Sequence, residues 1–251
     1  GIMSVTGEPD GQPMKVGVAI ADMMTGLHTT IAILAALKHR DATGQGQHVD
    51  AALVDTQVSW LMNQAMNYLV GGKVPHRTGN VHPNVAPYEV FETADGHVIL
   101  ACGSERQFAS FCAVIERTDL TADPKFESNA ARLRNLDALR DILGPLFKAR
   151  ETDAWVSALE AAKVPCGPVN TVDRVFADPQ VQARGMHQTI KGHAHAPDGV
   201  PTVAYPIKLS ETPAQYRRPP PILGQHTEEV LGEELGLPAA HLAELRANGV
   251  I

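Results

Sequence analysis

The stretch that most constrains the fold is residues 16–39 (VGVAIADMMTGLHTTIAILAALKH), where apolar residues lie on nearly every side of a helix. A helix that is apolar all round must be covered on more than one side. Its small residues, among them Ala19, Gly26 and Ala32, allow neighbouring elements to approach closely. The sequence therefore predicts a central helix here. Wherever its cover is missing, we expect an exposed apolar patch or a partner chain.

Composition is that of an ordinary globular enzyme. The chain has 251 residues, 44% of them hydrophobic and 20% charged, with a formal net charge of -7. That is enough to bury a sizeable core. No Lys/Arg run exists, which disfavours a nucleic-acid partner. No apolar run is expected to reach membrane-spanning length and no signal peptide is recognisable, so we expect a cytoplasmic protein without a membrane partner.

The three cysteines, Cys102, Cys112 and Cys166, are odd in number and match no zinc spacing. Reduced thiols in a cytoplasmic protein are the simplest interpretation. Two tryptophans, Trp60 and Trp155, are expected in the core.

Turn signals divide the chain into segments of different character. DATGQG (41–46) breaks the first helix, QHVDAAL has β-like alternation, and a second helix ends at Gly71-Gly72. Two β-rich runs over 87–92 and 97–102 are joined by Asp95-Gly96, which favours a hairpin. A helix follows with Ser104 as its N-cap.

Further helices are predicted at about 128–149 and 152–162, with short ones after Asn170 and Asp178. GVPTVAYPIKLSET reads as a strand, RRPPPILGQ as an extended proline linker, and two helices close the chain. We expect an α/β fold with a discontinuous large domain (1–74 and 188–251) around a smaller α+β domain (75–187).

Four ordered stretches resemble one known family: GIMSVTGEPDGQPMKVGVAIADMMTGLHTTIAILAAL, ATGQGQHVDAALVDT, RTGNVHPNVAPYEVFETADGHVILACGSERQF, and ADPKFESNAARLRN with VPCGPVNTVDRVFADPQVQARGM. The family is the class III CoA-transferases, the formyl-CoA transferase and carnitine dehydratase group, which includes the α-methylacyl-CoA racemases. The form GNxHPNxxPYxxFxTADG looks most like its dicarboxylate-type transferases.

The resemblance implies an acyl-CoA:carboxylate CoA-transferase that forms an aspartyl anhydride and thioester. CoA is then a substrate and no separate cofactor is needed, and succinate is a candidate acid. Family members form interlocked homodimers, and 204–224 is the expected wrapping segment. The nucleophilic Asp of the family precedes the segment that matches GIMSVTG, so this chain resembles a C-terminal portion. Asp22, Asp50 and Asp55 sit in or beside helical patterns and are not expected to replace it.

The resemblance also places residues 79–84 (GNVHPN) over the thioester. Asn80 and His82 are the supporting catalytic candidates, and Gly79, Asn84 and Arg77 the substrate-binding ones. Taken from the residues alone, the same loop is a turn leading into the strand at Tyr88. TGQGQ lacks the lysine of a phosphate loop, and HAH (193–195) has no carboxylate or cysteine cluster beside it. A racemase of the same family, or an inactive fragment that only binds CoA esters or a partner chain, are the alternative functions.

Overall fold

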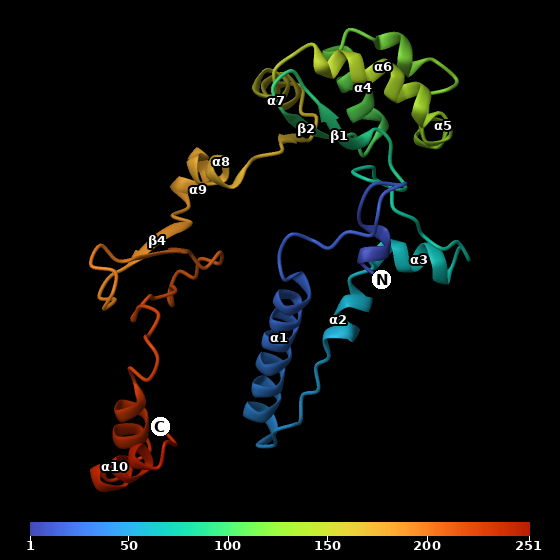
Figure 1. The fold of residues 1–251 in the computed structure, drawn as a ribbon. Coiled ribbons are helices and arrows are strands. Elements are labelled where there is room, and N and C mark those ends of the chain that lie inside the picture. The colour runs from blue at the N-terminus through green and yellow to red at the C-terminus, as the bar shows by residue number, and fades with distance from the viewer. The chain divides into compact units, whose positions relative to one another are not determined.

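The computed structural model describes all 251 residues (Figure 1). The chain forms two compact units, residues 1–169 and 170–251, each of which is described by itself. The elements of the first unit are η1 (Met3–Val5), α1 (Ile20–Thr43), α2 (Leu53–Ser59), α3 (Met62–Leu69), β1 (Tyr88–Glu92), β2 (His97–Ala101), α4 (Glu105–Val114), η2 (Thr118–Thr121), α5 (Asn129–Arg134), α6 (Leu136–Lys148), α7 (Thr152–Ala161) and β3 (Cys166–Pro168).

The second unit contains α8 (Val172–Ala177), α9 (Pro179–Ala183), β4 (His187–Ile190), β5 (Val200–Val203), the π-helical turn η3 (Glu229–Glu234) and α10 (Ala239–Ala247). Strands β4 and β5 form an antiparallel pair in register from His187↔Val203 to Ile190↔Val200. Only two hydrophobic side chains of this unit, Ala204 and Leu242, are buried.

A closed core lies within residues 86–164. The antiparallel sheet has the order β1-β2-β3; α6 packs on β1, and α7 packs on β2 and β3 (Figure 1). Phe147 lies at its centre, with its ring 4.3 Å from that of Phe91 and 4.6 Å from that of Trp155. The indole nitrogen of Trp155 donates to the Phe147 carbonyl, so this large ring is buried with its polar atom satisfied.

Local signals placed most elements of this region correctly, but the helix expected over 128–149 is two helices, α5 and α6, which meet at Asn135. The hairpin closes with Thr93 N donating to the Gly96 carbonyl, and the Ser104 hydroxyl caps α4 by accepting from Gln107 N. Asp95 also accepts bonds from both the amide and the hydroxyl of Thr152. Those bonds tie the hairpin to the first turn of α7 and hold the pKa of Asp95 below its usual range.

Elsewhere three predictions were wrong. QHVDAAL forms no strand, because no neighbouring strand offers it hydrogen bonds. The second helix is two helices, α2 and α3, interrupted at Trp60-Leu61 with Met62 at a φ of 44°. Trp60 is 41% exposed rather than in the core, and its indole nitrogen lies 3.3 Å from the His28 imidazole of α1.

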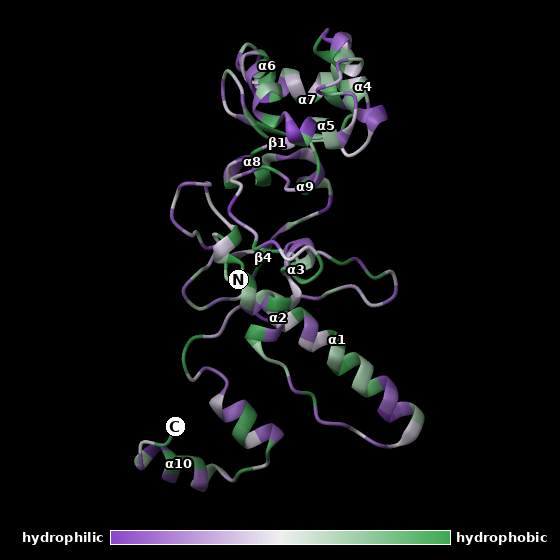
Figure 2. Ribbon diagram, turned by 90° about the vertical axis from the view of Figure 1, so that its right-hand side faces the viewer, coloured by the Kyte–Doolittle hydropathy of each residue, from purple (hydrophilic) through white to green (hydrophobic).

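Helix α1 has no buried residue, although hydrophobic residues recur along it (Figure 2). Among the elements of its unit it packs mainly against α2. The exposed apolar patch expected for residues 16–39 is therefore present. By length and composition α1 is also able to cross a membrane, which corrects the expectation that no apolar run is long enough. A core helix of a non-membrane protein passes the same test.

The expected domain bounds at 74/75 and 187/188 stay a prediction. The strand expected over 199–212 ends at Val203, the last residue of β5. Residues 204–224 contain no helix or strand, and their exposed side chains include Tyr205, Ile207 and Leu223.

Candidate functional site

The predicted site loop, residues 79–84, connects the α3 region to β1 and has no regular secondary structure. All five predicted site residues lie in this loop or directly before it. Two groups of hydrogen bonds from distant parts of the chain hold its two ends.

The first anchor joins the start of the loop to the turn at residues 7–11. Gly79 N donates to the Gly7 carbonyl at 3.0 Å. The guanidinium of Arg77 donates to the carbonyls of Glu8 (3.2 Å) and Gly11 (2.6 Å). Gly79 has a φ of 62°, a backbone conformation that favours glycine. A Cβ there would lie 3.0 Å from a carboxylate oxygen of Glu8, a flexible side chain that can move aside. The structure thus gives Arg77 a loop-holding contact, and its predicted role toward a substrate stays a prediction.

The middle of the loop is organised around His82. Its backbone N–H donates to the Tyr88 carbonyl at 2.8 Å, and its ring stacks on that of Tyr88 with centroids 5.0 Å apart. Nδ1 of His82 accepts from Asn84 N at 3.1 Å. Because Nδ1 is an acceptor, a neutral ring carries its proton on Nε2. Nε2 makes no hydrogen bond within the chain, so His82 presents a donor and is poorly arranged as a general base.

The second anchor comes from α5. The Asn129 side chain donates to the Asn84 carbonyl at 2.9 Å and accepts from Ala86 N at 3.0 Å. Nε of Arg132 donates to the Ala86 carbonyl at 2.6 Å. Arg132 also pairs with Glu105, and this contact holds the pKa of Glu105 below its usual range.

Asn80 and Asn84 have exposed side chains. The edge of the loop at Pro83 and Asn84 lines a cavity of about 790 Å³ in the first unit. Its polar lining includes Asn67, Lys73 and His76. Lys73 makes no ion pair, so this cavity carries uncompensated positive charge.

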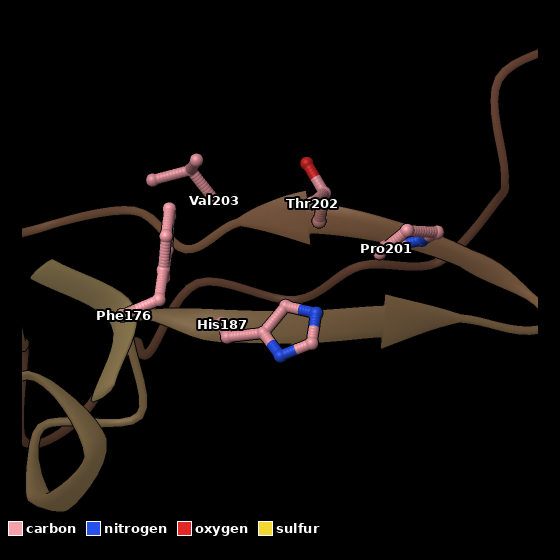
Figure 3. Close-up of a pocket in the computed structure, with 5 residues that line it drawn as sticks. All are labelled: Phe176, His187, Pro201, Thr202 and Val203. Carbon is pink, nitrogen blue, oxygen red and sulfur yellow. The ribbon is translucent and has the colours of Figure 1, made fainter. Parts of the chain in front are cut away.

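A second pocket, in the other unit, contains none of the predicted site residues. Figure 3 shows Phe176 of α8 and His187 of β4 facing residues of β5 across a cavity of about 370 Å³. Its lining is almost wholly apolar. His193 and His195 lie in a separate loop, and no group of three or more potential metal ligands occurs in residues 1–251.

The cysteine thiols are poorly suited to nucleophilic chemistry. Burial raises the pKa of Cys102 and of Cys112 to about 12, and burial also raises the pKa of Cys166. At neutral pH these thiols stay protonated, and a thiol is a weak nucleophile. The interpretation of all three as reduced, structural cysteines agrees with their being unpaired.

Comparison with known proteins now places this geometry in a family. The model of CoA-transferase family III matches residues 1–227. The chain belongs to CoA-transferase family III. It is 46% identical to the succinate–glutarate CoA-transferase of Agrobacterium fabrum over 93% of this chain and 58% of that protein. It is 37% identical to the human succinyl-CoA:glutarate CoA-transferase over 100% of this chain and 57% of that protein.

A solved structure of a CaiB/BaiF family protein from Brucella suis shows the same fold, with a TM-score of 0.76 and 43% identity over 92% of this chain and 60% of that one. The resemblance inferred from the motifs and the mixed helix-and-sheet class are therefore confirmed. The chain spans less than two thirds of the length of each of these family III relatives.

Sequence reasoning singled out residues 79–84 but missed the residues that hold this loop. Asn129 and Arg132 lie more than forty positions downstream of their loop partners, in a stretch (NAARLR) that reads as a polar helix surface. Lys73 and His76 were also missed, because nothing in KVPH marks a cavity wall. Arg132 precedes the apolar residue Leu133, and nothing in the sequence indicates that Arg132 itself is buried.

Proposed function

We propose that this chain is part of an acyl-CoA:carboxylate CoA-transferase that exchanges CoA between carboxylic acids, including a dicarboxylate such as succinate. The supporting observation is family membership together with 46% identity to a succinate–glutarate CoA-transferase. Coenzyme A enters the reaction as a substrate, and the chemistry requires no further cofactor.

The reaction proceeds through covalent intermediates. An enzyme carboxylate attacks the thioester carbonyl of the donor, the C–S bond breaks, and a mixed anhydride and CoA thiolate result. The thiolate then attacks the aspartyl carbonyl of the anhydride, which releases the donor acid and leaves an aspartyl-CoA thioester. The acceptor carboxylate repeats these steps in reverse and leaves with CoA. We infer that the nucleophilic aspartate lies in the part of the family III protein that residues 1–251 do not span.

The loop over residues 79–84 supplies the groups that this chemistry needs besides the nucleophile. Each addition to a carbonyl develops negative charge on oxygen, and fixed N–H donors stabilise it. Nε2–H of His82 and the side-chain amide of Asn80 are the donors we assign to this oxyanion. Gly79 keeps the backbone close to the turn at Gly7, and Asn84 orients the ring of His82.

The cavity beside Asn84 is where we place the carboxylate substrate. Lys73 brings positive charge to its wall, and the ring of His76 and the amide of Asn67 add polar contacts. Arg77 holds the 8–11 turn through the carbonyls of Glu8 and Gly11. We infer that its remaining N–H groups are available to a carboxylate or a CoA phosphate.

Assembly as an interlocked homodimer would cover the exposed apolar surfaces. Those surfaces lie on α1 and in residues 204–224, where Leu34 is 61% and Leu223 is 104% exposed. Residues 204–224 would wrap the partner. Three free cysteines fit a reducing, cytoplasmic setting, and we infer no nucleic-acid or membrane partner.

The test is a coupled assay with succinyl-CoA and a panel of dicarboxylates. It is run on residues 1–251 alone and on the same chain fused to the part of the Agrobacterium fabrum relative that lies outside the match. We expect exchange from the fusion and none from residues 1–251, because loss of a covalent nucleophile removes several orders of magnitude of rate. Robust exchange by residues 1–251 would show that one of their own carboxylates is the nucleophile.

Within the fusion, His82→Ala and Asn80→Ala should each lower turnover by about 10-fold or more if they stabilise the oxyanion. His195→Ala, an exposed histidine in the second unit, is the matched control and should leave turnover unchanged. If the fusion racemises a 2-methylacyl-CoA and shows no CoA exchange, the function is that of a racemase of the same family and not that of a transferase.

A further inference from the structure

Arg132 is a fully buried charge beside the core. It is 1% exposed, and its guanidinium lies 4.2 Å above the ring of Phe108. Burying a guanidinium is costly unless every contact is satisfied, and an apolar side chain of similar volume often serves stability as well or better. The geometry of its contacts therefore matters more than the volume that it fills.

Those contacts converge on the end of the site loop. Besides the Ala86 carbonyl, Arg132 donates to the carbonyl of Phe126 at 2.9 Å and to the Glu105 carboxylate at 2.7 Å. The other oxygen of Glu105 accepts from the backbone N–H of Asn129 at 2.9 Å. Glu105 thus joins Arg132 to Asn129, three residues earlier on the same helix face.

The Asn129 side chain forms hydrogen bonds with the loop backbone on both sides of Val85. Its amide nitrogen reaches the Asn84 carbonyl and its oxygen accepts from Ala86 N. These two bonds fix consecutive peptide groups. The N–H of Asn84 belongs to the peptide just before them, and it is this N–H that donates to Nδ1 of His82.

A continuous series of hydrogen bonds therefore leads from the buried arginine to the imidazole. We propose that Asn129 and Arg132 are positioning residues that hold the backbone at Asn84–Ala86 so that His82 keeps its proton on Nε2 and presents it as a donor. The proposal rests on the proposed function for its catalytic consequence, but the state of the imidazole is measurable without any activity.

The first test uses residues 1–251 and long-range ¹H–¹⁵N NMR of the histidine side chains, with His82 assigned by His82→Gln. In the parent chain we expect His82 in the Nε2–H form. In Asn129→Ala we expect a mixture of both tautomers and exchange of the Asn84 amide with solvent at least about tenfold faster. Core amides such as that of Leu100 should keep their protection.

Asn135→Ala is the matched control. Asn135 follows the same helix, and its side-chain amide donates to the carbonyls of Lys125 and Ala131 rather than to the loop. It should leave the His82 signal unchanged. Should Asn129→Ala fail to fold, Asn129→Asp keeps the acceptor for Ala86 N and removes the donor to Asn84, and the same tautomer change is expected. Arg132→Lys should keep the parent signal only in part, because lysine lacks the planar group with which arginine reaches three acceptors.

An unaltered His82 tautomer and unaltered Asn84 exchange in folded Asn129 and Arg132 variants would overturn the proposal. In the active fusion described above, Asn129→Ala should lower kcat about 10-fold while changing KM for the acyl-CoA less than about 3-fold, as expected for a donor that acts in the transition state. If the fusion shows no exchange at all, the proposed function fails, and the NMR result still decides the positioning role.

Discussion

Residues 1–85 and residues 86–164 both carry many large apolar side chains, but they end in opposite states. The second stretch buries a core of sixteen hydrophobic residues that starts at Phe91 and ends at Val164. The first stretch buries no hydrophobic side chain at all, and Met23, Leu27, Ile31 and Leu34 of α1 are each more than half exposed. Apolar content alone therefore does not decide what becomes core.

The difference comes from where the covering elements lie in the sequence. In the 86–164 core, a hairpin and the helices α4, α6 and α7 follow one another within a short stretch and close over one another. Helix α1 has only α2 as a neighbour along the chain, and one short helix covers one side of it. Its other faces need partners that are not its sequence neighbours.

A pair of matched truncations tests this contrast most strongly. Phe147→Ala removes a fully buried ring that stacks on Phe91 and Trp155, and it should lower the free energy of unfolding by about 3–5 kcal/mol. Leu34→Ala in α1, at 61% exposure, should change it by no more than about 0.5 kcal/mol. Urea titration followed by tryptophan fluorescence measures both. Equal losses would mean that α1 is packed as tightly as the core.

The same substitution in both regions gives a second, smaller contrast. Thr152 is 2% exposed, and its hydroxyl lies 2.6 Å from that of Thr93 and 2.8 Å from an Asp95 oxygen. Thr152→Val should destabilise by about 1–3 kcal/mol, because the buried Thr93 hydroxyl loses a partner. Thr30→Val removes only an exposed bond to the Gly26 carbonyl of α1 and should cost little. A loss of stability in Thr30→Val as large as that in Thr152→Val would show that α1 is as well ordered by its contacts as the core of residues 86–164.

A charged substitution on α1 tests whether a second copy of the chain covers this helix. If a second copy covers the helix, Leu34→Lys should weaken self-association by about tenfold or more, since burying one leucine contributes about 1.5–3 kcal/mol. Thermal stability of the single chain should not change. Sedimentation velocity over a range of concentrations measures the effect, with His195→Lys, an exposed position outside α1, as the control. Unchanged association of Leu34→Lys would remove α1 from the interface.

The same contrast explains how much the sequence could predict. The β1–β2 hairpin, the Ser104 cap and the short helices after Asn170 and Asp178 depend on neighbouring residues, and their prediction was correct. QHVDAAL was expected to be a strand, but a strand needs a partner, and alternation alone supplies none. The interruption at Trp60-Leu61 has no Gly or Pro to announce it.

The candidate site shows this difference at smaller scale. His82 and Asn84 could be singled out because they stand in one short motif. The tautomer of His82 could not be predicted, because it depends on Asn129 and Arg132, which fold back onto the loop from α5. Contacts between distant positions leave no local pattern in a single sequence.

The smallest expected effect lies inside the closed core, at Glu89 on β1. Its side chain is 8% exposed and pairs with Arg140 at 2.8 Å, but its Oε1 is buried without a partner. Burial raises the pKa of Glu89 above 4.5, and the neighbouring Arg140 only partly opposes this. The folded protein therefore holds this proton to a higher pH than the unfolded chain does. Its contribution to stability is complete below pH 4.5 and declines as pH rises through the folded pKa.

Glu89→Gln should remove this decline, so the difference in unfolding free energy between variant and parent should shift in favour of the variant from pH 4 to pH 7. The half-exposed Arg140 loses a charged partner but can be hydrated, which keeps the cost of the substitution small. Glu92→Gln on the same strand is the control with the opposite sign: its hydrogen bond to Lys148 lowers the pKa of Glu92, so its stabilisation is lost as pH falls. A parent chain whose stability rises steadily over this range, with Glu89→Gln parallel to it, would show that water reaches Glu89 and that this part of the core is more open than its exposed fractions indicate.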